Sequence, residues 1–86
     1  MASVQEIIRD VQQIKKDSEE LATMTGVAGQ RLVESANDIA AMVQGSRSGM
    51  DAVMALNVAS RSLASAAASI LGLGNTCDKF INNASK

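Results

Sequence analysis

The chain has 86 residues, enough for one small domain, and its eight basic and nine acidic residues nearly cancel. It contains no histidine, tryptophan, tyrosine or proline and a single cysteine, Cys77. This composition excludes an internal disulfide and a cysteine–histidine metal site, lacks a basic footprint for nucleic acid, and removes the commonest general base. We therefore expect a protein that is not an enzyme and that binds no cofactor, metal, nucleic acid or small-molecule substrate.

The first predicted element is a helix over about residues 3–43. Ser3 and Glu6 have the spacing of a capping box at its start. Apolar residues then recur at heptad spacing, with polar lapses, at positions 4, 7, 11, 14, 18, 21, 25, 28, 32, 35, 39 and 42. Gly26 and Gly29 each cost roughly 1 kcal/mol in a helix interior. Because the heptad keeps its phase across them, a bend inside one continuous helix is favoured over a break into shorter helices.

Glycine and serine predict a turn over about residues 44–49, close to the middle of the chain. Asp51 is expected in the first turn of the following helix, where a negative charge suits the helix dipole. A short connection at this place makes the two flanking helices antiparallel neighbours. The segment is not a phosphate-binding loop, because no strand is predicted before it and no lysine follows it at the required position.

A second helix is predicted over about residues 50–72. Its heptad row comprises Val53, Leu56, Ser60, Leu63, Ala67, Ile70, Gly74, Cys77, Ile81 and Ala84. The segment Leu71–Asn75, with two glycines, predicts a kink or a helix end. A kinked or fraying helical tail is expected over about residues 76–86. Cys77 lies on the apolar row, so we interpret it as a packing residue and not as a reactive thiol.

Charge is distributed unevenly between the two halves. The first helix carries seven acidic and four basic residues, including the surface pairs Lys15/Glu19 and Lys16/Glu20, whereas Arg61 is the only charged residue between Ala52 and Cys77. A helix with so few charges is rarely solvated on all sides. We therefore predict that a partner chain covers part of it. The predicted partner interface comprises Val53, Leu56, Leu63, Ile70 and Leu71.

These elements predict an all-α protein, an antiparallel two-helix hairpin. A hairpin of this kind can be completed as a four-helix bundle by dimerisation or by the helices of a partner. The first residues are acidic and amphipathic and do not read as a signal peptide, and the uncharged run at residues 62–77 is too short to span a bilayer. We expect a protein made in the cytoplasm without a cleavable signal peptide and without stable membrane insertion.

The turn resembles a known family. A chain somewhat below 100 residues, with two antiparallel helices and a hydrophobic-x-glycine motif at the central turn, is similar to the WXG100 or ESAT-6-like proteins. The matching residues are Val43, Gln44 and Gly45, with Val43 at the position that the family fills with tryptophan. The resemblance implies a small bacterial protein of type VII secretion, exported or placed at the cell surface by that system.

The resemblance also implies a targeting element and a partner. In the family an aromatic residue near the end of the second helix is followed four positions later by an acid; here Phe80 is followed by Ala84. Divergent members without the tryptophan pair with the helical N-terminal region of LXG toxins and help to deliver them. The resemblance therefore implies a hairpin that pairs with itself or with a toxin's helical domain.

Two other functions fit a short helical hairpin. One is a filament subunit similar to the needle or rod proteins of type III secretion, whose turn typically contains proline, which this chain lacks. The other is a cytosolic coiled-coil adaptor or chaperone without a role in secretion.

Overall fold

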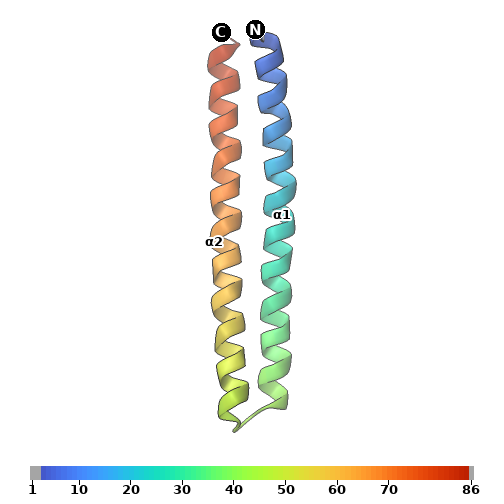
Figure 1. Cartoon of the computed structure of the whole chain (residues 1–86), viewed down its shortest axis with the longest axis vertical. Helices are drawn as coiled ribbons and strands as arrows, with labels where there is room; N and C mark the ends of the chain where they lie inside the picture. The colour runs from blue at the N-terminus through green and yellow to red at the C-terminus, as the bar shows by residue number, and fades with distance from the viewer. Residues whose placement is uncertain (1–2, 86) are drawn as a thin grey trace.

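The protein is an antiparallel helical hairpin, as predicted. The computed structural model describes residues 3–85 and contains two long helices, α1 (Val4–Met42) and α2 (Arg47–Ala84). They lie side by side along their whole length, with both chain ends at one end of the molecule and the turn at the other (Figure 1). The rod measures 63 × 19 × 14 Å. Its only helix–helix contact within the described residues is the one between α1 and α2.

Helix α1 begins at the predicted cap and runs without a break. The Glu6 N–H donates to Ser3 Oγ at 3.1 Å, which satisfies one of the free N–H groups at the helix start. The helix continues through Gly26 and Gly29, so the continuous interpretation is confirmed. Gly29 is where α2 comes close: a Cβ added there would lie 3.4 Å from the Ser60 carbonyl oxygen.

The turn is shorter than predicted and occupies Val43–Ser46. Gly45 has a φ of 84°, in the left-handed region that glycine enters without steric cost, and the Ser46 N–H donates to the Val43 carbonyl at 2.9 Å. Ser46 caps α2 by accepting from the Gly49 N–H at 3.2 Å. The helix therefore starts at Arg47 instead of residue 50, and Asp51 lies beyond the first turn, contrary to the prediction.

Helix α2 corrects the prediction for the C-terminal part. It passes through Gly72 and Gly74 and ends at Ala84, so there is neither a helix end at residue 72 nor a separate tail; Lys86 lies outside the described residues. The physical reason is packing. Cys77 is buried and Ile81 is half-buried on the side facing α1. Their burial outweighs the roughly 1 kcal/mol that each glycine costs in a helix.

The heptad row predicted for the second helix is confirmed: none of its ten positions is exposed. The row pattern predicted for the first helix is half right. Positions 11, 18, 25, 32 and 39 face α2, but the second inner row is 8, 15, 22, 29 and 36, one residue later than predicted. Ala22, Gly29 and Ala36 are buried, because small residues let the two helices approach closely. The larger residues at 7, 14 and 21 are exposed.

Gly49 gives a prediction about the turn. A Cβ added at Gly49 would overlap the side chain of Val43, which folds back over it. Gly49→Ala is expected to lower the free energy of unfolding by about 1–3 kcal/mol, although alanine is the better helix former. The control is Gly72→Ala, where an added Cβ meets open space; it should stabilise by about 0.5–1 kcal/mol. Urea unfolding measures both, and an equal effect of the two substitutions would contradict the packing of Val43.

Candidate functional site

The contact between the helices uses small side chains and leaves large ones outside. The buried residues of α1 are Ser18, Ala22, Gly29 and Ala36, and those of α2 are Val53, Ser60, Gly74 and Cys77. The Ser18 and Ser60 hydroxyls donate to the carbonyls of Ile14 and Asn57 in their own helices, so they need no partner across the contact. No large side chain is fully buried in the described part of the chain. The hairpin therefore covers little of its own apolar surface.

Six of the exposed large apolar residues (Ile7, Ile14, Leu21, Met42, Leu73 and Phe80) lie in two rows along one side of the rod. The α1 row lies one residue before its inner row, at Ile7, Ile14, Leu21, Ala28, Ser35 and Met42. The α2 row lies one residue before its own inner row, at Ala52, Ala59, Ala66, Leu73 and Phe80. Residues seven apart lie nearly on one strip of a helix, and the inner rows keep the same spacing, so each of these rows follows the helix–helix junction. We call the surface formed by these two rows the front face; neither row contains a charged residue.

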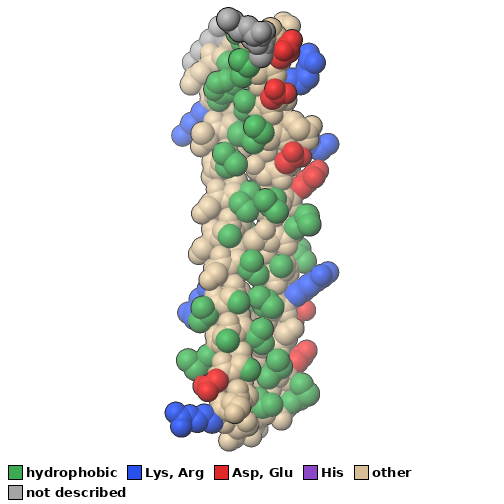
Figure 2. Space-filling model, viewed as in Figure 1, with side chains coloured by type: hydrophobic (Ala, Val, Ile, Leu, Met, Phe, Trp, Pro, Cys, Tyr) green, Lys and Arg blue, Asp and Glu red, His purple; other side chains and the backbone are tan. Residues whose placement is uncertain are grey.

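The two rows belong to the same side of the hairpin. A hollow lined by Gly26, Val33, Ala64 and Leu71, among others, joins α1 to α2 on one side. The front row of α2 lies on the side of its inner row that is opposite this hollow; it contains Ala59, Ala66, Leu73 and Phe80. Ile14 and Leu21 lie on the corresponding side of α1. Figure 2 shows a face on which apolar side chains follow the junction of the helices from end to end, with charged side chains along the edges.

The front face is apolar and accessible. Leu21 is 51% exposed and Phe80 42%, and Ile7, Ile14, Leu73 and Met42 are also exposed. Single exposed apolar residues are normal on a protein surface, but a continuous uncharged stretch indicates a binding surface. The heptad spacing of both rows suits contact with further helices, because each row can enter the groove beside a partner's row.

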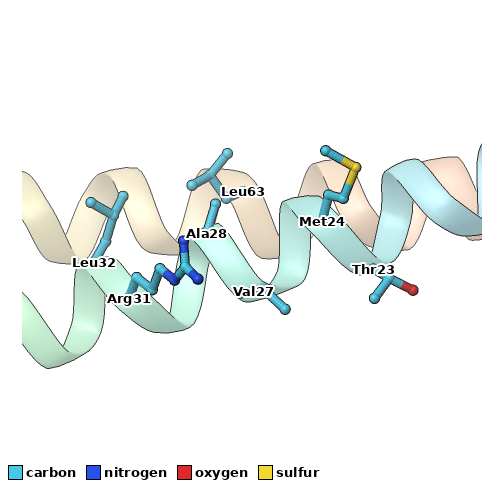
Figure 3. A pocket seen from close by; sticks show the side chains of 7 residues that line it. All are labelled: Thr23, Met24, Val27, Ala28, Arg31, Leu32 and Leu63. Atoms are coloured by element: carbon cyan, nitrogen blue, oxygen red, sulfur yellow. The ribbon is translucent and has the colours of Figure 1, made fainter.

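A shallow hollow interrupts the front face near its middle. It encloses about 630 Å³ and is lined by Thr23, Met24, Val27, Ala28, Arg31, Leu32 and Leu63. Met24, Ala28 and Leu32 project from α1 on the same side as Leu63 of α2 (Figure 3). The hollow forms where Ala28 presents only a methyl group between larger side chains. The lining is mostly aliphatic, with Arg31 at the rim, so the hollow suits an apolar side chain and offers no acid–base pair for chemistry.

Most of the residues predicted for a partner interface are used inside the hairpin. Val53 is buried, and Leu56, Leu63 and Ile70 are half-buried on the row that faces α1. Leu71 alone is exposed, and it lines the hollow on the side opposite the front face. The sequence pattern did reveal the front row of α1, since positions 7, 14, 21, 28, 35 and 42 belong to the predicted seam, but it assigned them to the inside.

The residues singled out by the resemblance occupy two places. Val43, Gln44 and Gly45 form the turn at one end, and Val43 packs over Gly49. Phe80 lies within α2, not after it, on the front face near the chain ends. The turn motif therefore has a structural role in this hairpin, whereas Phe80 is available to a partner.

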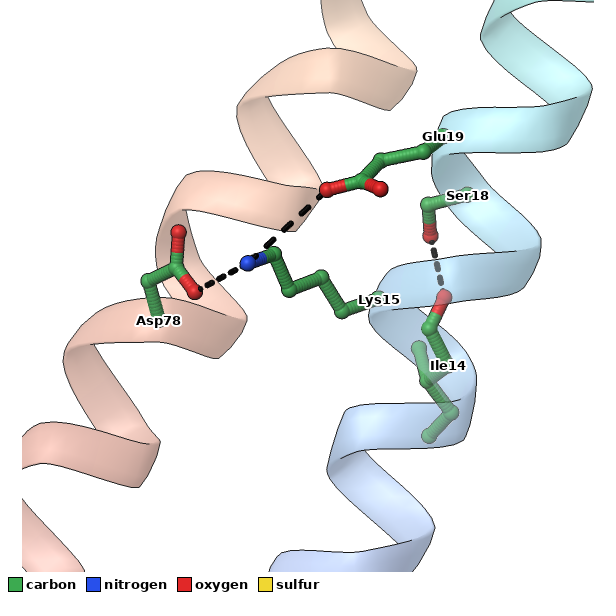
Figure 4. Close-up of polar contacts among 5 residues, drawn as sticks. All are labelled: Ile14, Lys15, Ser18, Glu19 and Asp78. Carbon is green, nitrogen blue, oxygen red and sulfur yellow. Dashed lines mark hydrogen bonds and ion pairs between the residues drawn. The ribbon is translucent and has the colours of Figure 1, made fainter.

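One ion pair joins the two helices near the chain ends. Lys15 Nζ of α1 lies 2.7 Å from Asp78 Oδ1 of α2 and 3.8 Å from Glu19 Oε1, as Figure 4 shows. The hydrogen bond to Asp78 and its negative charge raise the pKa of Lys15 above the ordinary 10.5, and Glu19 adds to the effect. The predicted pair of Lys15 with Glu19 is confirmed. The nearer partner, Asp78, was not predicted, because it depends on how the two helices align.

The raised pKa of Lys15 predicts the pH dependence of stability. A lysine whose pKa is raised in the folded state stabilises the fold fully below its unfolded pKa, about 10.4. That contribution is lost as the pH rises through the raised pKa. Asp78→Asn should therefore lower the melting temperature slightly at pH 7–9 in low salt, and the gap to the unsubstituted protein should close above about pH 10.5. Exposed Glu34→Gln is the control; a gap that is constant to pH 11 would contradict the pairing.

Two further properties concern membranes and metals. By length and composition alone α2 could cross a membrane, and it is the one helix of the described residues that could. Its inner row lies against α1, a helix with eleven charged residues. Among residues 3–85, no three cysteine, aspartate or glutamate side chains gather as metal ligands would.

No protein-family model, curated protein or solved structure matches the chain.

Proposed function

We propose that the protein is a non-catalytic binding hairpin of a bacterial type VII secretion system, and that its front face receives the helices of another protein chain. The observation that carries the proposal is the front face itself: two uncharged rows, which include the exposed Ile7, Ile14, Leu21, Leu73 and Phe80, run along a rod made of only two helices. Covering such a face with helices completes a four-helix bundle, in which each helix has two neighbours.

Burial energy supports a helical partner. Each leucine, isoleucine or phenylalanine of the front face contributes about 1.5–3 kcal/mol when fully removed from water. The isolated hairpin forgoes roughly half of this gain for Ile7, Ile14, Leu21, Leu73 and Phe80, because each is about half exposed. A partner that covers them adds large apolar side chains to a contact whose fully buried residues are mostly alanine, glycine and serine. Binding and folding are therefore expected to be thermodynamically linked.

The assignment to type VII secretion rests on the resemblance and is supported by the form of the hairpin. The two helices are nearly equal in length, and the turn at Val43–Gly45 lies at the middle of the chain with the positive φ at its glycine. Phe80, the candidate targeting residue, lies on the front face. A targeting aromatic at this position would be shared between the partner and the secretion machinery, which suggests that the bound complex is what is exported.

Export and pairing together test the proposal. The chain is expressed, and detected with an antibody, in a bacterium that has a type VII system and in a matched strain without the secretion ATPase. The helical N-terminal region of an LXG toxin from that bacterium is co-expressed. We expect to find the chain in the medium only when the ATPase is present. If the chain only assists export, we expect it to stay in the cells bound to the toxin region. Retention in the cytoplasm of both strains, free of the toxin region, would contradict the proposal and favour an adaptor.

Substitutions locate the surface in the same experiment. Leu73→Asp places a charge on the front face and should abolish both export and pairing with the toxin region. Val58→Asp, on the outer surface of the same helix, is the matched control and should leave both unchanged. Equal loss with the two variants would show that the front face is not the surface concerned.

A further inference from the structure

We infer that this chain has a second, open form, in which the turn becomes helical and two copies pair as straight antiparallel helices. In the open form α1 and α2 are one helix from about residue 4 to residue 84, and each half packs on the opposite half of the other copy. The product is a two-stranded coiled coil that is about 120 Å long at the helical rise of about 1.5 Å per residue. It contains no hairpin, because neither chain folds back on itself. The open form goes beyond the proposed function and does not depend on it.

The first support is that the heptad rows continue through the turn without a change of phase. The inner row of α1 that ends at Ile39 reaches Val53, in an inner row of α2, in two heptad steps. The α1 row of the front face ends at Met42 and continues through Gly49 to Leu56, in the other inner row of α2. A turn interrupts the helix, so a hairpin alone does not require the second helix to keep the phase of the first. A straight coiled coil does require it.

Joined in this way, the rows form one seam along the whole chain. We call it the long seam; it comprises positions 4, 7, 11, 14, 18, 21, 25, 28, 32, 35, 39, 42, 46, 49, 53, 56, 60, 63, 67, 70, 74, 77, 81 and 84. The hairpin uses the rows of the second half, which face α1. It uses only one of the two rows of the first half, because α1 turns Ala22, Gly29 and Ala36 inward and its front-face row outward. The long seam is therefore only partly buried in the hairpin.

A slide of one helix along the other allows the whole long seam to be buried. In the hairpin a Cβ added at Gly29 would lie 3.5 Å from the Leu63 Cβ, so these two residues are level. The turn ties the end of α1 to the start of α2 and fixes this level. Two straight helices have no such tie, and a slide of about four residues, roughly 6 Å, brings Thr25 opposite Leu63 of the other copy. At this level every position in the first half of the seam faces a position in the second half.

The facing positions are complementary in size along much of the long seam. Pairs of a large and a small residue include Ile14 with Gly74, Leu21 with Ala67, and Ile39 with Gly49. Large residues face each other where Leu32 meets Leu56 and Ile7 meets Ile81. The two-fold symmetry repeats each pair on the other side of the centre. Large side chains opposite small ones fill the contact and keep the two helices evenly spaced.

The open form also buries residues that the hairpin leaves outside. Ile7, Ile14 and Leu21 are about half exposed in the hairpin, and all three belong to the long seam. Removing them from water favours the open form. In exchange, the inner row at positions 8, 15, 22, 29 and 36 moves to the edge of the contact, and Ile8 is its only large apolar member.

The turn acts against the open form. Gly45 and Gly49 are poor helix formers, and both lie inside the helix when the chain is straight. A single chain therefore folds back on itself. The open form is a dimer, so its population grows with protein concentration. Because it covers the α1 row of the front face, it also competes with any partner that binds there.

Energy transfer between the chain ends measures the open form. In a Cys77→Ala background, a donor and an acceptor are attached to Gln5→Cys and Asn83→Cys, which are exposed positions. The doubly labelled chain is diluted into an excess of unlabelled chain. In the hairpin the two chain ends lie together, so transfer is efficient (Figure 1). In the open form the two labels of one chain are about 117 Å apart, and transfer is lost.

Singly labelled chains give the complementary signal. In the open form residue 5 of one copy faces residue 83 of the other. A mixture of donor-labelled Gln5→Cys and acceptor-labelled Asn83→Cys should therefore gain transfer over the concentration range in which the doubly labelled chain loses it. Circular dichroism on the same samples verifies that the loss is not unfolding.

Two substitutions at the turn should shift the balance in opposite directions. Gly45 has a φ of 84°, so Gly45→Ala strains the hairpin turn and favours a continuous helix. We expect it to raise the association constant of the open form at least about tenfold. Gly72→Ala is the matched control; it makes the same change inside a helix that both forms contain, and it should shift the constant by less than about threefold.

Arg47→Pro should hold the chain in the hairpin. Arg47 is the first residue of α2, where proline is well tolerated, and the preceding Ser46 is already extended. In a straight helix the same proline removes a backbone hydrogen bond and clashes with the preceding turn of helix. We expect the association constant of the open form to fall at least about a hundredfold. Arg47→Ala, which removes the same charge without the ring, is the control.

The outcomes separate this inference from the proposed function. Transfer within one chain that stays efficient at every concentration, with Gly45→Ala as well, overturns the open form. Loss of transfer that Arg47→Pro leaves unchanged overturns it too. A chain that opens as expected but is neither exported nor bound by the toxin region supports the open form and removes the proposed function.

Discussion

Replacing Leu21 and Leu73 together with aspartate is expected to abolish association while leaving the hairpin helical. Both side chains are about half exposed in the single chain, so the contact between α1 and α2 does not depend on them. In a complex each would be buried, and an unpaired carboxylate against apolar surface costs several kcal/mol. We expect association to weaken by at least about 4 kcal/mol, a factor of about a thousand in the dissociation constant.

Sedimentation equilibrium measures this loss, and circular dichroism measures helicity on the same samples. Val58→Asp, at a residue 54% exposed on the outer surface of α2, is the control and should associate as the unsubstituted chain does. Undiminished association of the double variant would place the contact on another surface, most simply on the side of Leu71. Charging Leu63 or Ile70 would be a poorer experiment, because those residues pack against α1 and their loss would disrupt the hairpin itself.

The second large effect is expected inside the helix–helix contact, in the part near the turn. Ala36 is 1% exposed, the lowest value in the core, so a leucine there has no space unless the helices move apart. Ala36→Leu should destabilise by about 1–3 kcal/mol through overpacking. In a chain of this length that lowers the melting temperature by about 4–8 °C per kcal/mol.

Ala41→Leu is the matched control for Ala36→Leu. It makes the same change on the same helix at an exposed position, and it should alter stability by less than about 0.5 kcal/mol. Thermal unfolding is followed at one fixed protein concentration, because an associating chain has a concentration-dependent midpoint. A melting temperature raised by Ala36→Leu would mean that the helices are not in close contact at this level.

The sequence was sufficient to predict the two helices, both inner rows of α2 and one of the two inner rows of α1. Ser3, the glycines of the turn and the absence of proline indicated two helices and their antiparallel arrangement. The inner row of α2 was predicted in full because its alternatives at positions 52, 59 and 66 are alanines, which made the choice clear. For α1 the pattern favoured Ile7, Ile14 and Leu21 over Ala22, Gly29 and Ala36, since large apolar residues are normally inside.

The inner row of α1 depends on what α2 presents. The buried residues of α2 include Ser60, Gly74 and Cys77, which are small, and the backbone of Ser60 lies close to Gly29, so the close approach of the two helices becomes the better packing. That choice leaves the isoleucines and leucine outside and creates the front face. A pattern read on one helix at a time cannot contain this information. The pairing of Lys15 with Asp78 likewise depends on both helices, because the turn sets which residues of α1 and α2 lie at the same level.

The helix through Gly72 and Gly74 illustrates a competition that propensity alone does not resolve. Two glycines favour an end by roughly 2 kcal/mol in total relative to alanine. Continuing the helix places Cys77 and Ile81 against α1 and forms the Lys15–Asp78 pair. These tertiary contacts belong to the hairpin as a whole, and they outweigh the local preference.

A single tryptophan on the front face tests most directly whether another chain covers this face. The chain has no tryptophan or tyrosine, so Phe80→Trp gives a fluorophore without background. In a complex that covers the front face the indole would lie away from water. We expect emission to move to shorter wavelength and acrylamide quenching to fall when the toxin region is added or as the protein concentration rises, and we expect Leu21→Asp with Leu73→Asp to prevent both changes. Emission of a water-exposed indole under both conditions would contradict the claim that another chain covers the front face.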